Sequence, residues 1–225
     1  MKKVLGLGLV VVAGLVVFGA ACQPAANVTT NSSVNKGMTN GNTANQNAMT
    51  MNANQHMSTN QMQGDPNAAS ALYDLQFIDT MSAHHKGAVE MAEVALKKSS
   101  NEELKKFAQN IITDQNKEIA QMKDWREKWF KDKPPAKNME MAGMMDSMKM
   151  MMGDGMSKWE STSGKDFDLM FLDMMTPHHQ GAVTMANEAL KKAEHPEIKT
   201  LAQNIIKAQE AEIKQMAEWK AKWSK

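Results

Sequence analysis

From residue 74 onward, mostly apolar residues recur at intervals of three and four, which places their side chains on one face of an α-helix. The first stripe consists of Asp74, Phe77, Met81, His84, Ala88, Met91 and Ala95. The second consists of Leu104, Ala108, Ile111, Gln115, Glu118, Met122, Trp125 and Trp129. Both stripes follow the heptad pattern of antiparallel helices. They predict a helical hairpin over residues 69–131, whose second helix begins in a capping-box-like Ser100–Glu103 segment.

The hairpin pattern occurs twice. Residues 77–129 align without a gap to residues 171–223, with 29 identities in 53 positions. The second hairpin is expected over residues 166–225, and Pro196 suits the first turn of its second helix. Each hairpin alone would leave an apolar face uncovered. Two packed hairpins therefore predict an all-α fold, a four-helix bundle.

The N-terminus has the pattern of a secretion signal. A basic start precedes an apolar run from Val4 to Phe18 that is too short to span a bilayer comfortably. Residues 1–21 are therefore predicted to be a signal peptide. Cys22 falls where a bacterial lipoprotein is cut and acylated, although Gly19 stands where Leu is usual. We expect a lipid anchor at the cell envelope, with ordinary periplasmic release as the alternative.

Residues 22–68 are rich in Asn, Thr, Gln, Ala and Ser, and their only charges are Lys36 and Asp65. Such a segment buries too little apolar surface to offset the entropy of ordering it. The sequence predicts a disordered, Met- and Asn-rich tether here.

A polar layer interrupts the apolar seam of each predicted hairpin. Folding the first hairpin about its turn brings His84 opposite Gln115 and Met81 opposite Glu118. The first layer consists of Met81, His84, His85, Gln115 and Glu118, and the second of Met175, His178, His179, Gln209 and Glu212. Met91 and Met185 lie two turns further along the same stripes. Buried imidazoles and carboxylates are costly unless they are paired or bind a metal.

Two explanations of this layer remain open. The histidines could be ordinary core residues whose ring nitrogens are paired by hydrogen bonds to Glu118 and Glu212. A duplicated His-His pair flanked by Met favours metal binding instead, with the two glutamates as ligands or as outer groups that orient the imidazoles. Pro177 interrupts the third helix just before His178 and is expected to kink it, so the two copies need not be equivalent.

The strings MSAHHKGAVEMA and MTPHHQGAVTMA resemble the signature of the domain-of-unknown-function 305 family. That family is similar to ferritin-like four-helix bundles and includes CopM-like extracytoplasmic proteins that bind copper and support copper resistance. The resemblance implies a ferritin-like bundle of two repeated hairpins and copper as the ligand. Carried over by position, the motif residues are Met81, His84, His85, Met91, Met175, His178, His179 and Met185. Ala83 departs from the proline of the motif.

Residues 132–165 are predicted to be a Met-rich linker. Its nine methionines are Met139, Met141, Met144, Met145, Met148, Met150, Met151, Met152 and Met156. Because Met occurs on every face of this segment, a core helix is not expected. Neutral thioethers suit Cu(I), so the segment is interpreted as a low-affinity collector of Cu(I) or Ag(I). A pliable hydrophobic docking surface is the alternative.

Composition excludes several classes. A formal net charge of +1 argues against a nucleic-acid-binding protein. A single cysteine excludes a disulfide framework and leaves no activated nucleophile. No Glu-x-x-His pattern occurs, which weakens a ferritin-like iron oxidase or carrier. The sequence predicts a non-enzymatic protein that binds copper, preferably as Cu(I), with iron as the alternative ligand, a copper exporter as a candidate partner and a metal-free interaction bundle as the rival.

Overall fold

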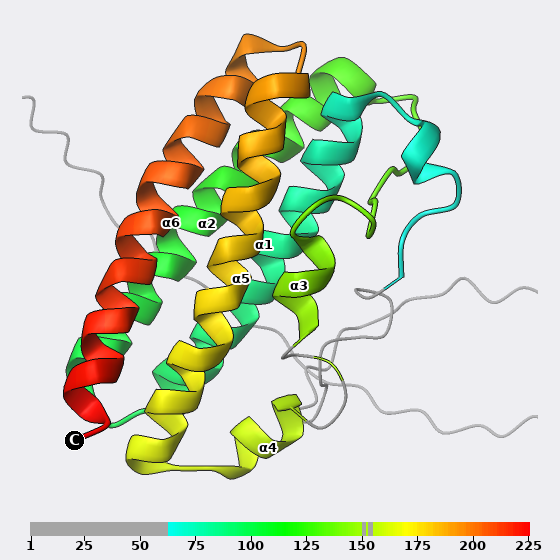
Figure 1. Cartoon of the computed structure of the whole chain (residues 1–225). Coiled ribbons are helices and arrows are strands. Elements are labelled where there is room, and N and C mark those ends of the chain that lie inside the picture. The colour runs from blue at the N-terminus through cyan, green and yellow to red at the C-terminus, as the bar shows by residue number, and fades with distance from the viewer. Residues whose placement is uncertain (1–62, 150–151, 153–154) are drawn as a thin grey trace, which may run out of the picture. The chain divides into compact units, whose positions relative to one another are not determined.

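The protein, studied as a computed structural model, is described over residues 63–149, residue 152 and residues 155–225. The predicted signal peptide, Cys22, most of the tether and Met150 and Met151 lie outside these residues. Four long helices dominate: α1 (Tyr73–Lys98), α2 (Glu102–Phe130), α5 (Gly164–Lys192) and α6 (Pro196–Trp223). Three short elements accompany them: η2 (Ala68–Ser70), α3 (Met144–Met148) and α4 (Gly155–Ser161). All regular elements of the described residues are helical (Figure 1).

The long helices are paired as two hairpins, α1 with α2 and α5 with α6, joined by tight turns (Figure 1). The N-cap of α2 is Asn101, whose side-chain oxygen accepts hydrogen bonds from the amides of Glu103 and Leu104 at 2.9 and 3.3 Å. The capping-box prediction was therefore wrong by one residue, because Ser100 precedes the cap. Pro196 opens α6, as predicted.

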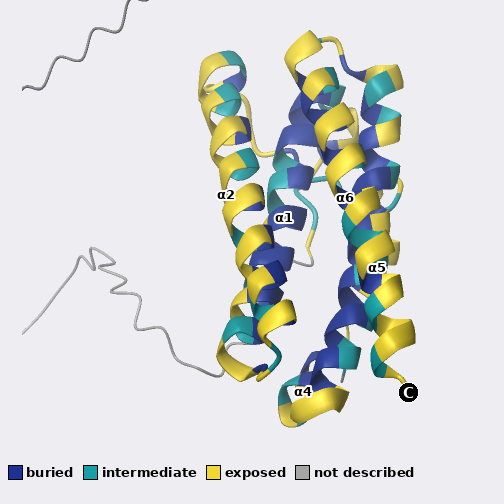
Figure 2. Ribbon diagram, turned by 90° about the vertical axis from the view of Figure 1, so that its left-hand side faces the viewer, coloured by how far each residue is buried: buried dark blue, intermediate teal, exposed yellow. Residues whose placement is uncertain are grey.

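The two hairpins meet through α1 and α5, which run antiparallel. Asp74, at the start of α1, accepts hydrogen bonds from the amides of Glu194 and His195, just beyond the end of α5, at 3.0 and 2.9 Å. Burial raises the pKa of the Asp168 carboxyl at the start of α5, and the nearby side chain of Ser99, at the end of α1, lowers it in part. The start of each hairpin thus lies at the turn of the other, and Figure 2 shows many buried residues, in dark blue, along α1 and α5.

Aromatic side chains join α2 and α6 near their ends. The ring of Trp219 meets Phe107 edge-on at 5.2 Å, and Trp129 stacks on His195 at 4.0 Å. Lys222 adds an ion pair to Glu103 at 3.2 Å. These tryptophans therefore pack at the edge of the apolar core.

The beginning of the linker is fixed to α1. The Asp79 carboxylate accepts a hydrogen bond from the amide of Ala136 at 2.8 Å, and the Thr80 hydroxyl accepts one from Asn138 at 2.8 Å. Asp65 exchanges two hydrogen bonds with Lys137, at 2.9 and 2.7 Å. The predicted tether reaches too far at its C-terminal end, because Asp65 is tied to the linker.

α3 packs on α5 with almost no side chain between them. Gly143 has φ +89°, and a Cβ on Gly181 would lie 2.4 Å from the Gly143 carbonyl oxygen and 2.5 Å from Ser147 Cβ. Four linker methionines are buried by this packing and by α4, namely Met141, Met144, Met148 and Met156. The expectation that the linker contains no core helix was wrong, because α3 and α4 are short helices whose buried methionines belong to the core. The sequence did not reveal which methionines are buried, because α3 is only five residues long and a helical repeat of apolar positions cannot be recognised over that length.

Candidate metal centre

The centre of the interface between the hairpins is a pair of histidines. His84 on α1 and His178 on α5 have ring centroids 3.8 Å apart and ring planes tilted by 39°. Both side chains are buried, with 1% and 0% of their surface exposed. The imidazole of one repeat thus contacts the imidazole of the other, which brings residues of two separate sequence motifs into one site.

A second histidine in each motif contacts a glutamate of its own hairpin. His85 Nε2 lies 2.6 Å from Glu118 Oε2, and His179 Nε2 lies 2.8 Å from Glu212 Oε2. The glutamate side chains are 18% and 19% exposed, whereas both imidazoles are fully buried. The predicted grouping of His and Glu at one level of each hairpin is therefore present, and the carboxylates form its solvent-facing edge.

The His pair that follows Pro177 has the same ring geometry as the pair of the first copy. α5 runs continuously through Pro177 from Gly164 to Lys192. The rings of His178 and His179 are 6.4 Å apart at 57°, and those of His84 and His85 are 6.3 Å apart at 58°. Pro177 therefore does not change the geometry of the two His rings relative to one another.

The ring nitrogens of this cluster are largely unpaired. Within the described part of the chain, both nitrogens of His84, His178 and His179 lack a hydrogen-bond partner, as does Nδ1 of His85. Nε2 of His179 is within ion-pair distance of Glu212 but makes no hydrogen bond to it. The side-chain oxygens of Gln115 and Gln209 are buried and unpaired as well. Buried polar atoms are nearly always paired in native proteins, since each orphan costs about 1–3 kcal/mol. So many buried, unpaired polar atoms in one place are expected where a bound ligand supplies the missing partners.

Burial lowers the pKa of His84 and of His178 well below the usual value, and the neighbouring imidazoles lower it further. Both rings are therefore neutral near pH 7. A neutral imidazole offers a lone pair to a metal ion without first losing a proton. The burial that disfavours the protonated form of these histidines keeps them in the neutral form, which is the form that can bind a metal.

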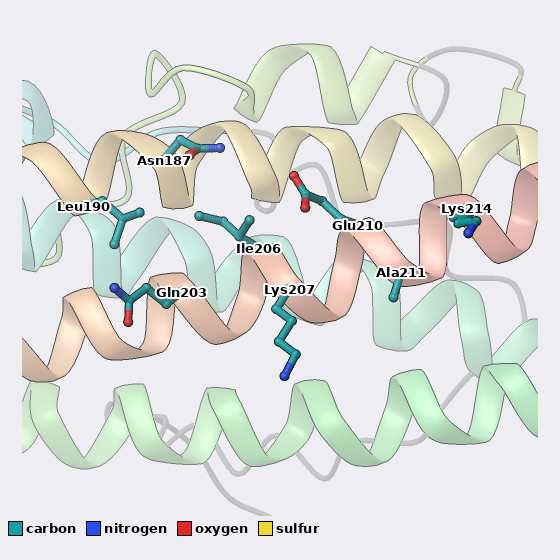
Figure 3. A pocket seen from close by; sticks show the side chains of 8 residues that line it. All are labelled: Asn187, Leu190, Gln203, Ile206, Lys207, Glu210, Ala211 and Lys214. Atoms are coloured by element: carbon teal, nitrogen blue, oxygen red, sulfur yellow. The ribbon is translucent and has the colours of Figure 1, made fainter.

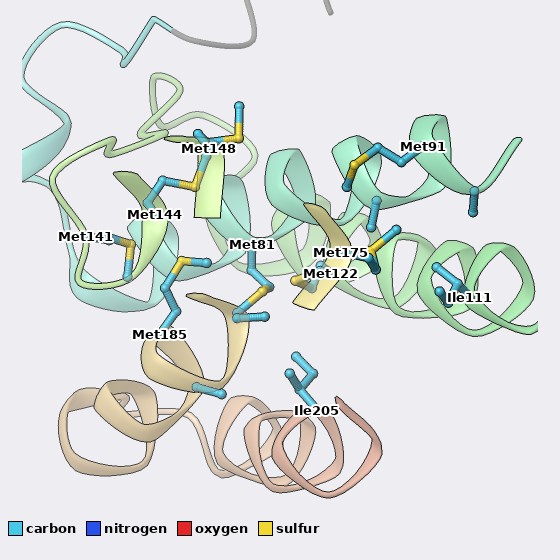
Figure 4. Close-up of a cluster of buried hydrophobic side chains, with 14 of the residues drawn as sticks. Met81, Met91, Ile111, Met122, Met141, Met144, Met148, Met175, Met185 and Ile205 are labelled. Atoms are coloured by element: carbon cyan, nitrogen blue, oxygen red, sulfur yellow. The ribbon is translucent and has the colours of Figure 1, made fainter. Parts of the chain in front are cut away.

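The four motif methionines are fully buried. Met81 lies one helical turn from His84, and Met175 one turn from His178, so each thioether shares a helix face with an imidazole. Figure 4 shows Met81, Met122 and Met175 within one cluster. Met122 and its counterpart Met216 are fully buried as well and were not among the predicted ligands. Their sulfurs lie 3.7 and 3.8 Å from the hydroxyls of Ser82 and Thr176.

The atoms that could bind a metal ion here are mostly imidazole nitrogens and thioether sulfurs, with few oxygens. Among the described residues, no group of three or more His, Cys, Asp or Glu is placed to hold a metal ion. A carboxylate-bridged di-iron arrangement is thus not present in that part of the chain, where each motif glutamate contacts one histidine. Imidazole and thioether donors suit Cu(I) and Ag(I).

The family comparison agrees with the motifs. The Domain of unknown function (DUF305) profile matches residues 74–220, which is more than half of the chain. The chain belongs to the DUF305 family. The match spans both hairpins and the linker between them, so all residues of the His–Met cluster lie within the DUF305 region. A search of curated proteins gives no match.

Solved structures of similar DUF305 chains include a copper protein. CopM in the Cu(I)-bound form is 41% identical, with a TM-score of 0.55, over 67% of this chain and 96% of CopM. CopM in the Cu(II)-bound form is 42% identical, with a TM-score of 0.56, over 67% and 97%. A DUF305 protein from Streptomyces coelicolor, described as secreted, is 29% identical, with a TM-score of 0.59, over 71% and 95%.

Two further features lie outside the cluster. A surface pocket between α5 and α6 contains none of the predicted ligands (Figure 3); it is lined by Asn187, Leu190, Gln203, Ile206, Lys207, Glu210, Ala211 and Lys214. Of the helices that the structure describes, none is long and apolar enough to cross a membrane.

Sequence reasoning also missed the contact of His195 with Asp74, at 2.5 Å. Its only signal was an acidic residue in an apolar stripe, repeated as Asp168 in the second copy.

Proposed function

We propose that this DUF305 protein binds Cu(I) and Ag(I) as cargo outside the cytoplasm, and sequesters or chaperones copper for copper tolerance. It is not an enzyme in this proposal. The observation that carries it is the buried pair His84 and His178, whose four ring nitrogens lack partners while thioethers share their helix faces. An apolar core without a ligand would have no use for such a pair.

The arrangement favours one shared central site and one flanking site in each hairpin. His84 and His178 supply one imidazole each to the shared site, with Met81 and Met175 as the nearest thioethers on the same helix faces. In the flanking sites, Glu118 holds Nε2 of His85 by a hydrogen bond and Glu212 lies beside Nε2 of His179, which leaves Nδ1 of each ring for the metal. A carboxylate that holds one imidazole nitrogen sets the ring orientation and raises the basicity of the other. Met91 and Met185 would extend the sulfur environment on either side.

The similarity to CopM supports the choice of metal. CopM structures exist in Cu(I)-bound, Cu(II)-bound and Ag-bound forms at about 40% identity to this chain. The neutral, soft donors of the cluster favour the monovalent ions among these. Iron remains the alternative ligand, although the donor set contains few carboxylates.

The proposal includes the remaining sequence predictions. The four long helices form a ferritin-like bundle that arose by duplication of one hairpin. Residues 1–21 direct export, Cys22 carries a lipid, and the tether holds the bundle near the membrane, where a copper exporter is the candidate partner. The exposed linker residues Met145 and Met152 belong to the low-affinity collector.

The test is a metal titration of residues 23–225 with Cu(I), Ag(I), Fe(II) and Zn(II) in the presence of a competing chelator. We expect several Cu(I) per chain, and loss of the tightest sites when His84, His85, His178 and His179 are replaced by Ala. His195→Ala, which removes a histidine outside the cluster, should leave Cu(I) binding unchanged. Tight Fe(II) binding with oxygen consumption would favour the oxidase instead. Absence of binding for all four metals would leave the interaction bundle.

A further inference from the structure

The linker brings a second set of thioethers against the motif methionines. α3 has methionine at three of its five positions, of which Met144 and Met148 are buried at 1% and 3% exposure and Met145 is 50% exposed. Met141, in the turn before α3, is buried at 9%. This short helix therefore has thioethers on both its inner and its outer side.

The position of α3 is fixed by the backbone contact of Gly143 with Gly181. Gly143 also approaches Thr184, the neighbour of Met185, because a Cβ on Gly143 would lie 2.9 Å from Thr184 Cβ. Met185 is one turn beyond Gly181 on the same face of α5. Figure 4 shows Met141, Met144 and Met148 on the side of the cluster where Met185 and Met81 lie.

Met185 and Met81 lead from α3 toward the central histidines. α1 and α5 are antiparallel and His84 meets His178, so Met81 and Met185 lie on the same side of the histidine pair. Helical rise places Met81 about 4.5 Å and Met185 about 10.5 Å from the level of that pair along the axis. The thioethers thus follow one another from the level of α3 to the imidazoles.

We infer that Met141, Met144 and Met148 form, with Met185, a thioether site for soft monovalent ions, and that Cu(I) and Ag(I) reach the central histidines through it. This inference rests on the proposed function. Thioethers suit the step because they bind these ions without a proton and can exchange them from one sulfur to the next. The exposed Met145 lies at the solvent end of the route, and the His84–His178 pair lies at its inner end.

Buried methionine also fills cores, and the test must separate the two roles. Leu has nearly the volume of Met and packs in its place at small cost, but it has no sulfur. Met144→Leu combined with Met148→Leu therefore keeps α3 packed and removes two thioethers. A matched control is Met170→Leu combined with Met174→Leu, which also removes one half-buried and one buried sulfur. Met174 lies four residues and Met170 eight residues before His178, on the side away from Met185, and neither is a predicted ligand.

The experiment measures how fast the full chain takes Cu(I) from a coloured chelator complex, together with the Cu(I) affinity at equilibrium. We expect Met144→Leu/Met148→Leu to load about tenfold more slowly, while the control loads at the wild-type rate. The tightest affinity should remain unchanged, because the central histidines are intact. A loading rate of Met144→Leu/Met148→Leu within about twofold of wild type overturns the inference.

The failure of this inference differs from that of the proposed function. If His84→Ala/His178→Ala abolishes the tightest site while Met144→Leu/Met148→Leu loads normally, only the route is wrong. If the wild-type chain itself takes no Cu(I) or Ag(I) from the chelator, the proposed function fails and the route fails with it.

Discussion

The imidazole rings of His84 and His178 lie 3.8 Å apart although they come from different hairpins. Neither ring has a hydrogen-bond partner in the described part of the chain, and burial keeps both neutral. The two repeats therefore meet at a pair of neutral, unpaired imidazoles, which is the pair that the proposed central metal site uses.

The first prediction concerns the cost of this pair to the metal-free protein. Replacing both His84 and His178 by Leu removes two buried unpaired polar groups, so the free energy of unfolding should rise by about 1–3 kcal/mol. Urea unfolding of the metal-free protein measures it. Added Ag(I) should stabilise the wild type, by about 2.7 kcal/mol at a hundredfold excess over Kd, and should stabilise the double variant much less. His85→Leu is the contrast, because it leaves Glu118 without its imidazole and should destabilise the chain.

The second prediction concerns pH. The pKa of His84 and of His178 is lowered in the folded protein, so below about pH 6.5 the unfolded chain binds protons that the folded chain does not. Stability is then complete above about pH 6.5 and decreases as the pH falls, by up to about 2.7 kcal/mol per pH unit for two sites. Urea unfolding of the metal-free protein between about pH 7.5 and about pH 5 tests this. The profile of His84→Leu/His178→Leu should be flatter, and an identical profile would contradict the assignment.

The third prediction compares the two copies. Glu118→Gln and Glu212→Gln each remove the charge that orients a buried imidazole, and each should weaken Cu(I) binding at its flanking site about tenfold. The two effects should be similar because the His–Glu distances are 2.6 and 2.8 Å. Chelator competition measures both. Glu210→Gln, an exposed carboxylate of the same helix as Glu212, should have no effect. A loss at only one copy would show that the repeats are not equivalent.

The fourth prediction concerns the contact that joins the hairpin ends. Asp74 accepts hydrogen bonds from the amides of Glu194 and His195 and also contacts the His195 ring. Asp74→Asn weakens this set and should lower the free energy of unfolding by about 1–3 kcal/mol, as measured by urea unfolding. Asp166→Asn, an exposed residue at the start of α5, should change it by less than about 0.5 kcal/mol. Equal effects would mean that Asp74 contributes only its charge near a helix end.

The fifth prediction concerns the packing of α3. Gly181→Ala places a Cβ 2.4 Å from the Gly143 carbonyl oxygen, so α3 must move and stability should fall by about 1–3 kcal/mol. Hydrogen exchange of the amides in residues 143–148 should become faster. Gly164→Ala is a contrast: at φ +60° with open space around it, it should cost about 1 kcal/mol and leave α3 protected. Unchanged exchange in Gly181→Ala would contradict the close contact.

Much of the site was predictable because the duplicated stripes mark one face of each helix. His84 and Gln115, or His179 and Glu212, are placed at one level by helical spacing and by a short turn. The sequence could not predict which histidine each glutamate contacts, because the side chains of adjacent helical residues point in directions that differ by about 100°. The structure pairs Glu118 with His85.

The sequence by itself determined the helices, the hairpins, the repeat and the soft donor set, since each depends on short-range periodicity or on residue chemistry. Only the tertiary structure decided that His84 meets His178 and that Asp74 reaches His195, because these contacts join residues about a hundred positions apart. It also decided which linker methionines are buried. That outcome depends on the approach of Gly143 to Gly181, a backbone contact between distant segments that has no periodicity of its own.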